Sequence, residues 1–177
     1  DINEDKHVTD CVGERFVEVI AGLDVGYRDE NCFIVVGYDG KYYYVIDEYV
    51  SRESTTAELA SIVSEKQDHW NIDTIYIDSA AQQTKADFAY DYDIYCENAI
   101  KSVNDGIAAL QTLIEHDCLI FDTEGAAHTF SAMSSYKWNP NTETPKPVHD
   151  WCSHPCDALR YAIYSHQRMS AVSVFTG

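Results

Sequence analysis

The chain lacks any long hydrophobic run, and that absence excludes one class of protein. No stretch of about 18 apolar residues occurs in the sequence, so we expect no transmembrane helix. The first residues, Asp1 to His7, are polar and do not contain the apolar segment of a signal peptide. The chain also lacks an initiator Met, which favours a fragment of a longer protein, although a processed end would look the same.

Basic residues are scarce. The 12 Lys and Arg residues stand against 30 Asp and Glu, which gives a formal net charge of −18. Proteins that bind nucleic acid broadly do so by neutralising phosphates with Lys and Arg, so this balance argues against that class. It leaves open a nucleic-acid enzyme in which metal ions and a local basic strip face the backbone.

Paired cysteine motifs are almost absent. Four of the six Cys residues stand singly in apolar surroundings, which favours reduced, buried thiols. The exception is Cys152-x-x-x-Cys156, with His149 and His154 nearby, which could be part of a zinc site. A structural zinc site usually has a second paired half, and none is present, so reduced thiols are the favoured interpretation.

The hydrophobic pattern predicts three strands followed by alternating helices and strands. Runs rich in β-branched and aromatic residues predict strands at 16–24, 31–38 and 41–49, and Asp39-Gly40 predicts a two-residue hairpin between the last two. Helical spacing and capping residues then predict helices separated by short strands. We expect helices at 54–70, 81–90, 102–116, 124–136 and 157–168, strands at 74–78, 94–96 and 118–121, and a loop or hairpin over 138–148.

This order predicts an α/β fold with a mixed central sheet, in which a three-stranded antiparallel meander precedes β/α units and helices flank the sheet. The length of 177 residues suits one domain with a sizeable core. We expect residues 1–15 to be a linker or lead-in, 16–170 to form the domain, and 171–177 to be a frayed tail.

Three acidic residues occur in settings that point to a metal site. Asp24 and Asp78 each close an apolar, β-branched run, and the carboxyl end of such a buried strand is where α/β proteins place their chemistry. Asp157 opens the last predicted helix, just after His154. Carboxylates gathered in this way suit Mg²⁺ or Mn²⁺, because hard cations prefer oxygen ligands.

Four segments together resemble the motifs of a known family. They are GLDVGY from Gly22, YIDSA from Tyr76, KSVNDGI from Lys101 and HPCDALRYA from His154. Each is weak alone, because Asp-x-Gly at a strand end occurs in many folds, but all four in this order are fairly specific. The chain from about 16 to 168 resembles the C-terminal nuclease domain of the large terminase subunit of tailed bacteriophages, a ribonuclease-H-like domain.

The resemblance implies a metal-dependent endonuclease that cuts concatemeric viral double-stranded DNA during genome packaging, by two-metal phosphodiester hydrolysis. It implies that Asp24 bridges two Mg²⁺ or Mn²⁺ ions, that Asp78 and Asp157 complete the cluster, and that His154 binds the second metal or orients water. A structural interpretation stands beside each role. Asp24 would cap the following loop, Asp78 and Asp157 would be helix N-caps, and His154 would be structural or exposed.

For the other acidic and basic residues near the motifs, the sequence gives weaker evidence of a functional role. Asp29, Asp105 and Asp150 are expected to be structural or exposed. Basic residues are predicted to line a DNA path, with ordinary surface solubility as the alternative. These residues are Lys85, Lys101, Lys137, Lys146 and Arg160.

The resemblance also implies partners. They are double-stranded DNA, the terminase ATPase domain of the same parent chain, the small terminase subunit and the portal, with no membrane and with the host cytoplasm as the compartment. No Walker A pattern occurs, so we expect the motor to lie outside this chain and these partners to supply much of the affinity for DNA.

Three alternatives remain open from the residues. One is another nuclease of the same fold, such as a junction resolvase or a transposase core. Another is a non-catalytic docking domain. A phosphotransferase of the actin and sugar-kinase type also uses a strand-end Asp-x-Gly, but 177 residues and 8 Gly give it little support.

Overall fold

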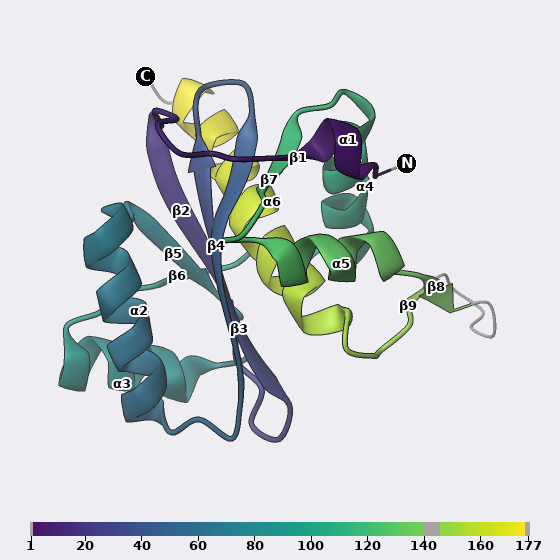
Figure 1. Cartoon of the computed structure of the whole chain (residues 1–177). Helices are drawn as coiled ribbons and strands as arrows, with labels where there is room; N and C mark the ends of the chain where they lie inside the picture. Colours follow the sequence, from purple (N-terminus) through teal and green to yellow (C-terminus); the bar gives the residue numbers. More distant parts are fainter. Residues whose placement is uncertain (1, 140–145, 176–177) are drawn as a thin grey trace.

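Seven strands form one mixed sheet, and helices cover both of its faces (Figure 1). The computed structural model describes residues 2–139 and 146–175. The strand order is β1-β7-β4-β3-β2-β5-β6, in which β3 is antiparallel to both neighbours and every other pairing is parallel. The strands are β1 (Val8–Thr9), β2 (Glu18–Asp24), β3 (Glu30–Tyr38), β4 (Tyr43–Arg52), β5 (Thr74–Ile77), β6 (Glu97–Asn98) and β7 (Leu119–Asp122). The predicted α/β class, with a meander followed by β/α units, is confirmed.

The helices divide between the two faces of the sheet. In Figure 1, α2 and α3 lie on one side of the strands, and α4, α5 and α6 lie on the other. The helices are α1 (Glu4–His7), α2 (Thr56–Trp70), α3 (Gln82–Tyr92), α4 (Val103–Glu115), α5 (Ala127–Ser135) and α6 (Ser153–Phe175). Although α6 is the longest, no helix among the described residues is long and apolar enough to cross a membrane.

The central strands are buried on both faces, which explains their continuous apolar sequences. Along β2, Ala21 and Leu23 belong to the core cluster that includes residues of α2 and α3. Ile20 belongs to the other cluster, which includes Ala158 and Ala162 of α6. Because side chains alternate along a strand, Gly22 and Asp24 face α6.

Several predicted boundaries need correction. The β3–β4 connection is a four-residue loop rather than a two-residue hairpin, because Asp39 Oδ1 accepts hydrogen bonds from the backbone N–H groups of Lys41 and Tyr42. The strand expected at 94–96 is replaced by β6, which begins at Glu97 where the chain reaches the edge of β5. A short antiparallel pair, β8 (Trp138–Asn139) and β9 (Lys146–Pro147), forms within the segment expected to be a loop or hairpin.

Both ends of the chain are more ordered than their sequences suggested. Residues 1–15 were expected to be a linker or lead-in; within the described part of this segment, α1 packs near β7 and β1 extends the sheet by pairing in parallel with β7. At the other end, α6 continues through most of the expected frayed tail, to Phe175. It also begins at Ser153, four residues before the predicted start, and this shift changes the setting of Asp157.

Candidate functional site

Strands β2 and β5 bring Asp24 and Asp78 side by side. Leu23 pairs with Ile77 across the two parallel strands, and the Asp78 backbone N–H donates to the Leu23 carbonyl oxygen at 3.1 Å. The carboxyl ends of both strands therefore meet at the same edge of the sheet, which is where the two acids lie.

Helix α6 brings Asp157 to this edge through an unusually close contact with β2. A Cβ atom on Gly22 would overlap the carbonyl oxygen of Ala158, so only glycine permits the two backbones to approach this far. Asp157 precedes Ala158 and lies in the second turn of α6. It is therefore not the N-cap of the helix, as the structural interpretation had proposed.

Burial and neighbouring negative charges raise the pKa of the Asp24 carboxyl group. The residue is only 6% exposed, and this desolvation is the main reason why its pKa is raised. The negative charges of Asp157 and Asp78 raise the pKa further, against the opposing effect of a hydrogen bond with His154. The charges of Asp157 and Asp78 thus disfavour the ionised form of Asp24, and a bound cation would oppose this effect.

His154 lies in the first turn of α6 and is held by Asp24. Its Nδ1 is 2.8 Å from Asp24 Oδ2, and this hydrogen bond is the largest cause of the raised pKa of His154. Its Nε2 lies 3.9 Å from Oδ2 of Asp29. The two ring nitrogens therefore face two different carboxylates.

The other two acids of the cluster each have a cationic partner. Lys101 Nζ lies 2.6 Å from Asp78 Oδ1, and Arg160 Nη2 lies 2.9 Å from Asp157 Oδ1. Asp78 Oδ1 also accepts the Ala80 N–H at 2.9 Å. Helix α3 begins later, at Gln82, and Asp78 does not cap it.

The burial of Arg160 corrects the expectation that it lines a DNA path. The residue is 3% exposed, and Nη1 donates to the backbone carbonyl oxygens of Lys101 and Ser102. Its guanidinium carbon also lies 5.1 Å from the ring centroid of Tyr161. These contacts make Arg160 a positioning residue that ties α6 to the segment before α4.

The remaining predicted cations differ in their surroundings. Lys85 Nζ donates to Asn98 Oδ1 at 3.0 Å, beside the carboxyl end of β6. Lys101 is partly exposed although it pairs with Asp78. Lys137 is exposed after α5, and the side chain of Lys146 lies outside the described residues.

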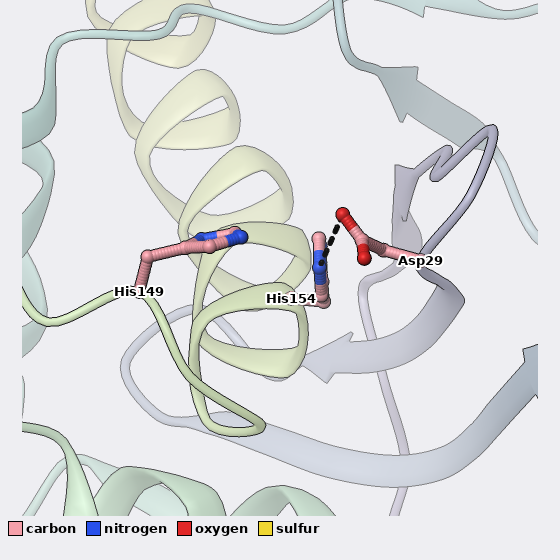
Figure 2. Close-up of side chains that lie close together, drawn as sticks. All are labelled: Asp29, His149 and His154. Atoms are coloured by element: carbon pink, nitrogen blue, oxygen red, sulfur yellow. Dashed lines mark ion pairs between the residues drawn. The ribbon is translucent and has the colours of Figure 1, made fainter.

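A second group of potential ligands was not predicted. Asp29, His149 and His154 each direct one ligand atom into a common region, and these atoms lie within 4.8 Å of one another (Figure 2). Asp29 was expected to be structural or exposed, and His149 was considered only as a neighbour of the cysteines. The His149-x₄-His154 spacing was a signal for this group, whereas the contribution of Asp29 depends on the fold.

The cysteines themselves do not contribute to that group. Cys152 and Cys156 are buried in a small cluster with Ala132, as expected for reduced thiols, and all six Cys residues are free. Asp105 and Asp150 have local structural contacts: the Ser102 hydroxyl donates to Asp105, and the Cys152 N–H donates to Asp150.

Comparison with known proteins identifies the family. The sequence model of the family described as the terminase RNaseH-like domain matches residues 21–166. The chain belongs to this family. It is 39% identical over 176 residues to the large subunit of the terminase of Escherichia phage T5, a match that covers 92% of this chain and 40% of that protein. This terminase domain therefore spans about 40% of the length of that curated relative.

Solved structures of terminases share the fold. The large terminase of a thermophilic bacteriophage matches with a TM-score of 0.82 at 21% identity, over 94% of this chain and 43% of that one. The large-terminase nuclease domain of bacteriophage SPP1, solved with bound Mn, matches with a TM-score of 0.71 at 21% identity, over 89% of this chain and 94% of that one. The terminase domain thus has the RNase H-like fold, and its family membership favours a terminase over the junction-resolvase and transposase alternatives.

Proposed function

We propose that this terminase domain is a divalent-metal-dependent endonuclease that cuts concatemeric viral double-stranded DNA during genome packaging. The observation that carries the proposal is the convergence of β2, β5 and α6, whose acids are Asp24, Asp78 and Asp157, at one edge of the sheet. A buried carboxyl group that is destabilised by two others is suited to binding a cation.

The donor set fits Mg²⁺ or Mn²⁺. Asp24, Asp78, Asp157 and His154 would hold the two ions. The contact of the Lys101 ammonium group with Asp78 is consistent with a cluster that accepts positive charge. When bound, a pair of such ions activates water and stabilises the leaving oxygen of a phosphodiester. The bound Mn of the SPP1 nuclease domain supports the choice of metal.

The protein residues around the cluster would hold the ligands in position. Arg160 donates to Asp157 and restricts its carboxylate, while the Gly22 contact fixes the distance between α6 and β2. Nδ1 of His154 is within hydrogen-bonding distance of Asp24, so His154 would give up this contact if Nδ1 were to ligate an ion of the cluster. Until then it can orient water beside Asp24.

The proposed DNA path and partners follow from the same assignment. Lys85, Lys101, Lys137 and Lys146 would contact the phosphate backbone. With a net charge of −18, the domain would depend on other components for much of its affinity. We propose the ATPase domain of the parent chain, the small subunit and the portal for this role, in the host cytoplasm.

The test is nicking and linearisation of supercoiled plasmid at low salt, with Mg²⁺, Mn²⁺ or EDTA. We expect metal-dependent cutting that Asp78→Asn abolishes and that Asp68→Asn, the same change at an exposed site on α2, leaves intact. Calorimetric titration with Mn²⁺ on the same three proteins should show binding that only Asp78→Asn weakens. If the chain neither cuts nor binds Mn²⁺ through Asp78, the docking-domain alternative is favoured instead.

A further inference from the structure

Three side chains with metal-binding atoms converge next to the carboxylate cluster, and none of them is one of its three acids. Asp29 comes from the loop between β2 and β3, His149 from the segment before α6, and His154 from the first turn of α6 (Figure 2). One ligand atom of each lies within 4.8 Å of the other two. Asp29 therefore supplies one oxygen, and His149 and His154 each supply one nitrogen, to the same region.

The orientation of His154 suits a metal ligand. Its Nδ1 is 2.8 Å from Asp24 Oδ2, so in the neutral ring a hydrogen on Nδ1 would be directed at the carboxylate and Nε2 would keep its lone pair. In metal sites, a ligating His commonly donates its second ring N–H to a carboxylate, which fixes the tautomer and the ring orientation. Asp24 provides that partner here, while Nε2 faces Asp29 at 3.9 Å.

The second imidazole lies close to the first. The rings of His149 and His154 have centroids 5.4 Å apart and an interplanar angle of 81°, so they meet edge to face. His149 and Asp29 are exposed, and His154 is partly buried. The strongly acidic chain also raises the local concentration of cations.

We propose that Asp29, His149 and His154 form a binding site for a divalent transition-metal ion of the Zn²⁺ or Co²⁺ class, which lies beside the Mg²⁺ or Mn²⁺ cluster and shares His154 with it. Two imidazoles and one carboxylate suit such borderline metals, whereas Mg²⁺ favours sites in which most ligands are oxygens. Three protein ligands leave at least one coordination position for water. The site does not depend on whether the chain cuts DNA.

His154 would connect this site to the carboxylate cluster. A metal on Nε2 keeps the proton on Nδ1, where it is shared with Asp24. Occupation of the site would therefore hold His154 away from any ion in the carboxylate cluster, and would keep it as a hydrogen-bond donor to Asp24. Transition metals and Mg²⁺ would compete for the use of one side chain.

The test uses the full chain without an affinity tag, because a His tag binds the same metals. Co²⁺ is followed by its visible absorption, and Zn²⁺ affinity is measured by competition with Co²⁺. We expect His149→Ala and Asp29→Asn each to weaken binding by roughly 10-fold or more, since loss of even a residue that orients a ligand typically costs 10–100-fold. His69→Ala, which removes an exposed His on α2, should leave the affinity unchanged.

Asp78→Asn separates this proposal from the proposed nuclease site. It should retain the Co²⁺ spectrum, whatever its effect on cleavage with Mg²⁺. The proposal is overturned if His149→Ala binds Co²⁺ as the unmodified chain does, or if only Asp78→Asn loses the spectrum. A thiolate-to-cobalt charge-transfer band that disappears in Cys152→Ser would also overturn it, because the ligands would then be cysteines. Circular dichroism of each variant establishes that it is folded.

Discussion

Gly22 of β2 lies so close to Ala158 of α6 that a methyl group on Gly22 would overlap the Ala158 carbonyl oxygen. This contact sets the separation of the helix that carries Asp157 from the strand that carries Asp24. The Ala158 oxygen is a backbone atom and a Cβ is fixed to the strand backbone, so neither can move aside as the end of a flexible side chain would. The position of the third acid therefore depends on a residue with no side chain.

Gly22→Ala should destabilise the chain. Inserting a methyl group at a closely packed site typically costs about 1–3 kcal/mol of unfolding free energy, and a backbone obstacle puts the expected value at the upper end. Urea denaturation measures the change. An unfolding free energy within error of that of the unmodified chain would show that α6 can shift without cost.

The contribution of Asp24 and His154 to the stability of the metal-free chain should fall as pH rises above the ordinary pKa of each group and through its raised pKa. Asp24 and His154 both have pKa values raised by folding, mainly by burial for Asp24 and by their mutual hydrogen bond for His154. The folded state therefore holds protons that the unfolded state releases, and this contribution to stability is present at low pH and lost as each raised pKa is passed.

Asp24→Asn should flatten that pH dependence and stabilise the chain at neutral pH, because the neutral amide removes the cost of a buried charge. Urea unfolding in EDTA at several pH values measures the unfolding free energy of each variant and its dependence on pH. Asp68→Asn removes one negative charge from the surface and is the matched control. Equal pH slopes in the two variants would mean that net charge, not Asp24, governs the effect.

Arg160→Lys should lower the unfolding free energy by about 1.5–3 kcal/mol, the range for hydrogen bonds to charged groups. Arg160 bonds to Asp157 and to two backbone carbonyl oxygens from one planar group, and an ammonium group cannot reproduce that arrangement. Arg52→Lys, at an exposed pair with Glu30, should change it by less than about 0.5 kcal/mol. If thermal or urea unfolding shows that Arg160→Lys and Arg52→Lys lose similar amounts of unfolding free energy, the positioning role of Arg160 is contradicted.

Lys101→Met should tighten Mn²⁺ binding by about 2- to 10-fold, because the ammonium group at 2.6 Å from Asp78 must give way to a metal. Lys85→Met removes the same charge from a contact with a neutral amide, Asn98, and should have a smaller effect. Calorimetric titration with Mn²⁺ compares the affinities of the two variants with that of the unmodified chain. Equal changes in affinity would show that the general charge of the region matters and that the Lys101–Asp78 contact does not.

The strands and their carboxyl-end acids were predictable because the signals are local. Buried parallel strands need continuous apolar runs, and Asp24 and Asp78 interrupt such runs at their ends. The hairpin at Asp39 was misjudged because a side chain capped two backbone N–H groups and enlarged the loop. The pairing of β1 with β7 joins residues more than 100 positions apart, and no local pattern indicates it.

The sequence by itself determined the chemistry that is available: apolar runs that must be buried, three acids next to them, and a histidine one helical turn from the third. The tertiary structure alone decided which of these groups act together. Asp29 and Arg160 show this most clearly, since one became a neighbour of two histidines and the other a buried partner of Asp157. The physical reason is that burial, pairing and pKa depend on distances between segments, and only the packed chain sets those distances.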